Sequence, residues 1–148
     1  MFYEIKKITM QDLIATGYDL FVANSKEVEA ELGEPVNPDY DGYKRLEKAK
    51  ALFVMGAYYD SILVGYSIFG ILPMPHYRHV KAAQNFVIYI DKEHRGLIAK
   101  DLIKECEKTA KDYGVKRINW HVKFKKDWSP VLLRKGYEKE EMILTKKV

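Results

Sequence analysis

The sequence predicts a mixed α/β fold, a largely antiparallel sheet flanked by helices, in a single domain over residues 1–148. Two observations support this. Short apolar runs rich in β-branched and aromatic residues alternate with segments of helical spacing, in the order β-α-α-β-β-β-α-β-α-β. The chain also has the length of one ordinary domain, and no repeat or linker divides it.

The N-terminal segment is expected to contain a strand and two helices. Residues 2–8 alternate weakly and indicate the strand. Thr9 and Asp12 have the spacing of a capping box, which predicts that a helix begins there. This helical run continues or restarts until Gly33 ends it, and a second helix is expected over 39–51.

An apolar hairpin is predicted next, from runs at 52–59 and 62–71 separated by a two-residue turn. Residues 72–79 contain two prolines and interrupt the strand pattern, so we expect an exposed or cleft-lining connection there. The run at 82–90 is apolar enough to be a mostly buried strand.

The C-terminal segment begins with a helix that has one apolar stripe. Its apolar residues recur at helical spacing from Ile98 to Ala110, and Gly114 is placed to end it. Cys106 belongs to the stripe, which predicts an inert core residue. The remaining expected elements are a strand at 115–122, a short helix at 127–134 and a last strand at 137–145.

The net charge of +4 is unevenly distributed. Residues 1–91 carry 9 Lys/Arg and 12 Asp/Glu, whereas residues 92–148 carry 16 and 9. A basic half favours a polyanionic partner such as nucleic acid, a phosphate-bearing cofactor or an acidic surface. Charge alone favours the plainer interpretation, a solvated lysine-rich face.

Membrane insertion, disulfides and metal binding have no support in the sequence. The longest near-apolar run, 51–59, is about half of the ~20 residues that a membrane-spanning helix needs. The first residues lack the apolar centre of a signal peptide. The single cysteine has no partner at metal-ligand spacing. We therefore expect a cytoplasmic protein with no membrane partner and no metal.

The most informative segment is the strand, turn and helix from Phe86 to Cys106. The first N–H groups of a helix have no intrahelical partner, and the helix dipole is positive there. Gly96, just before the helix, lets the backbone approach a ligand closely. Together these features predict a pyrophosphate site, although many α/β proteins have a similar turn.

Residues 90–96 (IDKEHRG) resemble the GNAT superfamily of N-acetyltransferases, in which a V-D-P-E-Y-R-G-like run leads into the loop [QR]-x-x-G-x-[GA] that binds the CoA pyrophosphate. Residues 62–66 (ILVGY) are similar to the V-G-[YF] step of the family's third strand, and 134–137 (RKGY) to its K-L-G-F step. The resemblance spans essentially the whole chain. Residues 76–77 and 119–121 are also similar to GNAT proteins encoded by bacteriophages.

This resemblance implies acetyl-CoA as co-substrate and transfer of its acetyl, or another short acyl, group to a primary amine by direct attack in a ternary complex. It implies that strand backbone groups meet the pantetheine arm at Ile88, Tyr89 and Ile90. The residues expected to meet the pyrophosphate are Arg95, Gly96, Leu97, Ile98, Ala99 and Lys100.

Three positions depart from the family pattern. With a one-residue gap, Ala99 takes the last small position of the loop, but Leu97 stands where a glycine is expected, so the loop is shorter and stiffer. Leu132 replaces the tyrosine that protonates the CoA thiolate in many members. Gln84 and Asn85 stand near the usual carboxylate base, and neither titrates.

Histidines are the remaining candidates for catalysis. His121 is a candidate general base because imidazole titrates near neutrality, although a surface or hydrogen-bonded strand histidine is the plainer interpretation. His76 is a second catalytic candidate. With Tyr77 and His79 it is also expected to bind the acceptor, because GNAT loops before the fourth strand commonly approach that substrate.

Several alternatives stay open. The acceptor amine belongs to a small molecule, a polyamine or a protein. The altered loop also fits a non-catalytic CoA-fold binding or regulatory protein. A nucleic-acid-binding module using the basic half is a further alternative, but the run at 123–126 is too short to argue for it. The family resemblance further implies a possible homodimer.

Overall fold

The computed structural model describes residues 2–148, with the exception of the side chains of Glu31 and Leu97. Within these residues one sheet has the strand order β1-β2-β3-β4-β5. Neighbouring strands are antiparallel from β1 to β4, and β5 runs parallel to β4. The mixed, largely antiparallel sheet is thereby confirmed. The strands are β1 (Tyr3–Ile8), β2 (Leu52–Tyr59), β3 (Ile62–Met74), β4 (Tyr77–Ile90) and β5 (Arg117–Asn119).

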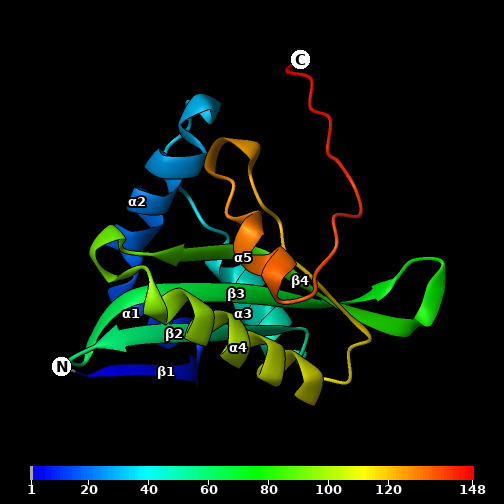
Figure 1. Cartoon of the computed structure of the whole chain (residues 1–148), viewed down its shortest axis with the longest axis horizontal. Helices are drawn as coiled ribbons and strands as arrows, with labels where there is room; N and C mark the ends of the chain where they lie inside the picture. Colours follow the sequence, from blue (N-terminus) through cyan, green and yellow to red (C-terminus); the bar gives the residue numbers. More distant parts are fainter. Residues whose placement is uncertain (1) are drawn as a thin grey trace.

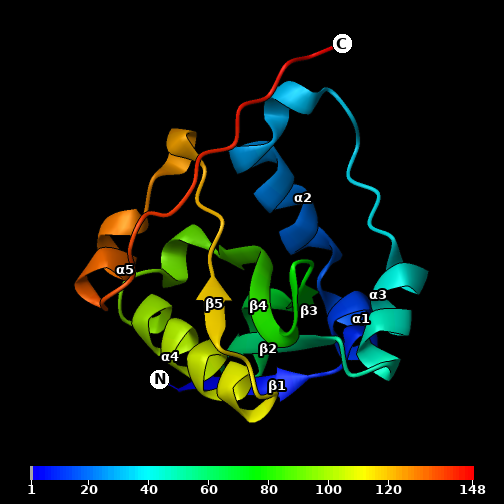
Figure 2. The same ribbon diagram turned by 90° about the vertical axis from the view of Figure 1, so that its right-hand side faces the viewer.

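Helices cover both faces of the sheet (Figures 1 and 2). One face carries α1, α2 and α3, and the other carries α4, with α5 on the same side as α4. Within the described residues, no helix is both long and apolar enough to cross a membrane. The helices are α1 (Met10–Thr16), α2 (Tyr18–Val28), α3 (Tyr40–Lys48), α4 (Leu97–Asp112) and α5 (Ser129–Arg134), with short 3-10 turns at Ala30–Leu32, Lys92–His94 and Phe124–Lys126.

Local signals set the beginnings of the N-terminal helices. The Thr9 hydroxyl accepts from the Asp12 N–H, and the Asp12 carboxylate accepts from the Thr9 N–H, both at 3.1 Å, so the predicted capping box is confirmed. The helical run restarts at Gly17, which separates α1 from α2. Gly33 ends it with a φ of 70°, and the Asp39 carboxylate caps α3.

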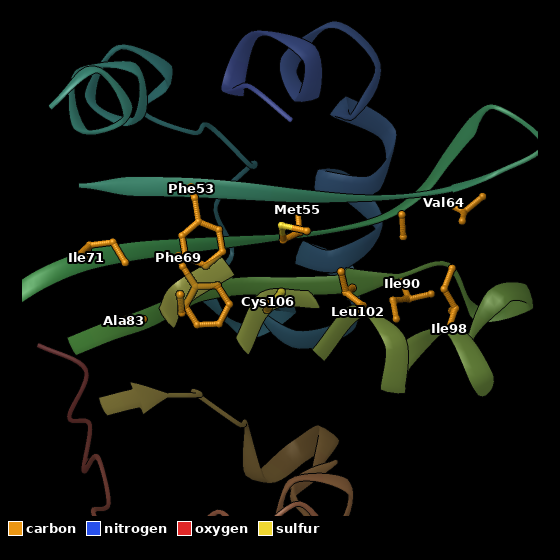
Figure 3. Packing of buried hydrophobic residues seen from close by; sticks show 12 residues of the cluster. Phe53, Met55, Val64, Phe69, Ile71, Ala83, Ile90, Ile98, Leu102 and Cys106 are labelled. Atoms are coloured by element: carbon orange, nitrogen blue, oxygen red, sulfur yellow. The ribbon is translucent and has the colours of Figure 1, made fainter. Parts of the chain in front are cut away.

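The face covered by α4 has an apolar core (Figure 3). The predicted stripe of α4 is confirmed, because Ile98, Leu102, Cys106 and Ala110 are all buried. They pack on the strands beside Phe53 and Phe69, whose rings stack with centroids 5.1 Å apart. Burial raises the pKa of Cys106 to about 12, so the thiol stays protonated and serves as core, as predicted.

Residues 72–79 are mostly exposed, as we expected, but they continue the strands and do not interrupt them. Strand β3 continues to Met74 and β4 begins at Tyr77, so the two strands form a long hairpin that projects beyond the sheet (Figure 1). Pairing between β2 and β3 ends at Leu52 and Gly70, which leaves β3 open on that side. Prolines are tolerated in strands at such open edges, so Pro73 did not stop the strand.

Of the two C-terminal strand predictions, the first is confirmed over a shorter range and the second was wrong. Of residues 115–122, only Arg117–Asn119 form a strand, and 137–145 form none. The last residues extend away from the sheet (Figure 1). Met142, Ile143 and Leu144 are 67%, 70% and 86% exposed. Strand formation depends on pairing with a neighbouring strand, and this segment pairs with none of the described strands, although Glu140 forms an ion pair with Arg117 of β5.

Candidate active site

The sheet opens between β4 and β5. The two strands pair only where Ala82, Ala83 and Gln84 lie opposite β5. Beyond Gln84, β4 continues to Ile90 with no described strand on that side. The backbone of Ile88, Tyr89 and Ile90, which the family resemblance assigned to the pantetheine arm, lies on this opened stretch. A strand edge of this kind presents N–H and C=O groups to a ligand.

A β-bulge lies at the point of opening. Ile68 pairs with Val87 and Phe69 with Asn85, so Phe86 is the extra residue. The buried Asn85 amide donates to the Ser67 hydroxyl at 2.9 Å and to the Val87 carbonyl at 3.1 Å. Bulges bend a strand and strengthen its twist, so this polar pair fixes the point where β4 turns from β5. A serine and an asparagine inside apolar runs were the sequence signal for it, and we missed that signal.

The turn after β4 leads directly into the N-terminus of α4. Gly96 has a φ of 87°, which favours glycine, and an added Cβ would meet no atom within 4 Å. Among the described residues the first turn of α4 contains no acidic residue. Ile98 is buried, so only its backbone can meet a ligand, whereas Lys100 is exposed. Leu97 begins the helix, but its side chain lies outside the described part.

Arg95 is held by a helix distant in sequence. Its Nη1 and Nη2 donate to the two carboxylate oxygens of Glu27 on α2 at 2.9 and 2.7 Å. Its Nε donates to the Ile90 carbonyl at 2.8 Å, and the guanidinium lies 5.5 Å from the centre of the Tyr89 ring. The hydrogen bonds from Arg95 lower the pKa of Glu27. The arginine predicted to meet the pyrophosphate therefore also joins this loop to α2.

Trp120 lies directly after β5, on the α4 side of the opening. Its ring meets those of Phe69 and Trp128 edge-on, with centroids 4.9 and 5.6 Å away. Among the described residues, Trp120 Nε1 is the one buried side-chain nitrogen or oxygen without a hydrogen-bond partner. The Tyr137 ring also meets the Trp120 ring edge-on, with centroids 6.5 Å apart, so this nitrogen lies inside an aromatic cluster under α4 and α5. The groups that fit CoA at the opened edge are therefore the backbone N–H and C=O groups of β4 and the N-terminus of α4.

The predicted histidines lie at two separate places. His121 is exposed beyond the end of β5, and its Nε2 is 3.2 Å from the side-chain oxygen of Gln84, where the strands part. His76, Tyr77 and His79 are exposed at the tip of the β3–β4 hairpin. At about 3.3 Å per residue, roughly 20 to 30 Å of strand separates these three from the bulge.

Two other features could mark a functional site, a metal-ligand cluster or another hollow that could hold the cofactor. The described residues contain no group of three His, Cys, Asp or Glu side chains placed to hold a metal. One open hollow of about 430 Å³ lies between β1 and α1, and another of about 290 Å³ lies between the end of α4 and Tyr137. Neither is lined by the opened edge of β4 or by the turn at Gly96.

Comparisons with known proteins agree with this geometry. The sequence profile of the Acetyltransferase (GNAT) family matches residues 16–128. No curated protein sequence matches the chain. Among solved structures, a ribosomal-protein-alanine N-acetyltransferase from Brucella melitensis biovar Abortus 2308 is 21% identical with a TM-score of 0.66, covering 100% of this chain and 99% of that one.

Two further structures show the same fold. A predicted acetyltransferase with acetyl-CoA from Clostridium acetobutylicum is 17% identical with a TM-score of 0.66, covering 99% of this chain and 96% of that one. The glucosamine-6-phosphate N-acetyltransferase from Arabidopsis thaliana is 12% identical with a TM-score of 0.71, covering 99% of each chain. At these identities the likeness establishes the fold.

The fold, the opened strand edge and the family match together define an acyl-CoA-dependent N-acetyltransferase, with acetyl-CoA as co-substrate. The chain belongs to the GNAT family of acetyltransferases. The family expected from residues 90–96 is thereby confirmed.

Proposed function

We propose that the protein transfers an acetyl, or another short acyl, group from acyl-CoA to a primary amine of a small molecule or protein, by direct attack in a ternary complex. The observation that supports this most strongly is the opening between β4 and β5, which leads into the turn at Gly96. A single path then offers strand backbone to an amide-containing arm and helix N–H groups to a pyrophosphate.

The cofactor side uses mostly backbone groups. Ile88, Tyr89 and Ile90 hold the pantetheine arm along the opened edge. The pyrophosphate lies against the backbone of residues 96–100. This half of the chain is basic, with 16 Lys/Arg and 9 Asp/Glu over residues 92–148. Polyanionic phosphates are favoured in such a field.

In the transfer step, the nitrogen lone pair of a neutral amine attacks the thioester carbonyl carbon. The C–N bond forms, the C–S bond breaks, and the electron pair leaves with the sulfur. The nitrogen loses one proton to a base, for which we favour His121 because it lies where the strands part. Leu132 is buried, so the thiolate takes its proton from water. Positioning of the reactants supplies much of the rate.

The hairpin tip has a more limited role in this proposal. His76, Tyr77 and His79 meet the acceptor only where that acceptor is long enough to reach along the hairpin, as a protein would be. His76 is therefore a weaker candidate for the base than His121.

The first test is calorimetric titration with acetyl-CoA of the native protein and of the Gly96→Trp and Gly114→Trp variants. Both glycines have a positive φ and open space around the position of a Cβ, at opposite ends of α4. We expect at least tenfold weaker binding for Gly96→Trp and little change for Gly114→Trp. Equal effects of the two variants, with both folded by circular dichroism, would remove the cofactor assignment.

The second test concerns the base. His121→Gln should lower kcat at neutral pH and leave the dissociation constant of acetyl-CoA unchanged, whereas the matched His79→Gln should affect neither with a small amine. A native kcat for His121→Gln would exclude this histidine.

A further inference from the structure

His94 lies in the short turn before α4 and contacts two tyrosines of the sheet. Its Nδ1 is 3.2 Å from the hydroxyl oxygen of Tyr3 on β1, which is hydrogen-bond distance. Its ring lies edge-on to the Tyr3 ring, with centroids 6.0 Å apart, and its centroid is 5.0 Å from that of Tyr59 at the end of β2. None of these three side chains has a part in the transfer step proposed above.

The three rings form one group, which we call the His94 cluster. Tyr3 pairs directly with Tyr59 across the two strands, and their ring centroids are 4.9 Å apart. Aromatic rings at such distances attract one another. The start of β1, the end of β2 and the start of α4 lie at the same end of the sheet (Figure 1). The cluster therefore joins the turn to the edge strand of the sheet, across 91 residues of sequence.

The next residue of the turn is held on the other face of the sheet. Arg95 donates to the carboxylate of Glu27 on α2 at 2.9 and 2.7 Å, and its guanidinium lies over the Tyr89 ring. Tyr89 belongs to the core on the α1–α3 face, whereas Tyr59 packs against the core on the α4 face. Consecutive side chains of the turn thus reach opposite faces, and both hold it just before α4 begins.

The turn has few other restraints at this point. Gly96 has a φ of 87°, and an added Cβ there would meet no atom within 4 Å. The N–H of His94 donates to the Asp91 carbonyl, and the N–H of Asp91 to the Val64 carbonyl, both at 2.8 Å. A glycine loses more conformational freedom on ordering than any other residue. Side chains that hold its neighbours in place reduce the entropy lost when a ligand binds, and so raise affinity.

We propose that His94 is a positioning residue for the cofactor. Through Tyr3 and Tyr59 it holds the turn in the conformation that presents the first N–H groups of α4 to the CoA pyrophosphate. This inference rests on the proposed function, which locates the pyrophosphate at the turn. It adds that the first strand of the chain contributes to cofactor affinity. His94 acts through the backbone of the turn and takes no part in proton transfer.

Calorimetric titration with acetyl-CoA is the first test. His94→Ala removes both the ring and the hydrogen bond, and it should weaken binding about tenfold. His94→Phe keeps a ring against Tyr59 and should recover most of that loss. Native affinity of His94→Ala would overturn the inference. Binding of His94→Phe as weak as that of His94→Ala would also overturn it, because the ring contacts would then not hold the turn.

A double-mutant cycle tests the contact between Tyr3 and His94. Tyr3→Phe and His94→Phe each remove one partner of the same hydrogen bond, so each should weaken acetyl-CoA binding about threefold. The double variant should be no weaker than either one alone. Tyr18→Phe, the same change at a tyrosine of α2 that is 53% exposed, should bind as the native chain does. Losses that multiply in the double variant would contradict the cluster.

Hydrogen exchange of the cofactor-free chain tests the turn itself. The N–H groups of Asp91 and Ala99 lie before and after the turn, and they donate to the carbonyls of Val64 and Gly96 at 2.8 and 3.2 Å. Both should exchange about tenfold faster in His94→Ala, because opening of the turn becomes easier. The N–H of Tyr113, at the far end of α4, should exchange as in the native chain. Unchanged exchange at Asp91 and Ala99 would show that the turn is held without His94.

The combined results separate this inference from the proposed function. If Gly96→Trp weakens acetyl-CoA binding and His94→Ala does not, the cofactor site stands and the role of His94 is rejected. Faster exchange in His94→Ala with native affinity would leave the cluster as a support of the fold and reject the positioning role. No binding of acetyl-CoA by the native chain would reject both.

Discussion

Two buried polar side chains on the α4 face of the sheet are hydrogen-bonded, whereas one on the α1–α3 face forms no hydrogen bond within the described part of the chain. On the α4 face, Ser67 and Asn85 hydrogen-bond each other and the bulge inside an apolar core. On the α1–α3 face, Tyr66 is as buried as Asn85, yet its hydroxyl has no partner among the described residues. A satisfied group stabilises the fold, whereas an unsatisfied one keeps its capacity for a ligand. Burial by itself therefore does not tell which polar groups are hydrogen-bonded here.

The largest effect should come from breaking the apolar core of the α4 face. Leu102 is completely buried, so Leu102→Ala removes contacts and leaves a cavity, and we expect a loss of about 3 kcal/mol in the free energy of unfolding. Urea denaturation measures it. Leu133→Ala, at a leucine that is 43% exposed, should cost far less, and similar losses for both would show that α4 does not carry the core.

The second largest loss of stability should come from breaking the hydrogen bond between Ser67 and Asn85. Asn85→Ala removes the amide that donates to the Ser67 hydroxyl and the Val87 carbonyl, so the bulge keeps only the hydrogen bond from the Ser67 hydroxyl to Val87 and gains a cavity. We expect a loss of about 2 kcal/mol by urea denaturation. In a double-mutant cycle with Ser67→Ala, the two losses should not add, because each change removes the same hydrogen bond. Strict additivity would mean that the pair does not act as a unit.

The ion pair between the faces should have a smaller, pH-dependent effect. Arg95 holds the pKa of Glu27 below its usual range, so the pair stabilises the fold above the unfolded pKa of about 4.3 and loses that effect as pH falls through the folded value. Because Arg95 is partly exposed, we expect Glu27→Gln to cost about 1 kcal/mol at pH 7.

Urea denaturation at pH 7 and near pH 3 measures this difference, with Glu29→Gln as the matched change on the same helix end. A cost of Glu27→Gln that persists at the lower pH would assign it to packing and not to the charge.

The smallest effect should come from Tyr66→Phe. Since the hydroxyl has no protein partner to lose, the free energy of unfolding should change by no more than about 0.5 kcal/mol. Asn85→Ala, which removes a hydrogen-bonded group of equal burial, should cost several times more. A loss as large as that of Asn85→Ala in urea denaturation would reveal a stabilising hydrogen bond to the Tyr66 hydroxyl and contradict this prediction.

Features with a local signal could be predicted from the sequence. The apolar stripe of α4 recurs every three to four residues, and the Thr9 capping box is complete within four. The hairpin turn at Asp60 and Ser61 has positive φ angles of 47° and 70°, as a tight turn requires. The turn at Gly96 was likewise evident, because a strand, a glycine and a helix follow one another directly.

Features that depend on a distant partner could not be predicted. Arg95 and Glu27 lie 68 residues apart, and neither position suggests the other. The run at 137–145 has strand-like composition, yet no neighbour pairs with it. His121 was expected on a strand, but β5 ends at Asn119 because the bulge turns β4 away. Strand pairing, unlike a helical stripe, is decided by residues elsewhere in the chain.

The strand order also bears on how the molecule assembles. Strands β1 to β4 are neighbours in the order of the sequence, and β2, β3 and β4 are joined by tight hairpins. Strand β5 reaches its place only after the chain has crossed through α4, and it is held by three residue pairs. Contacts between distant residues form late in folding. We expect pulse-labelled hydrogen exchange to show β2 to β4 protected before β5, so that the cofactor's place in the sheet is completed last.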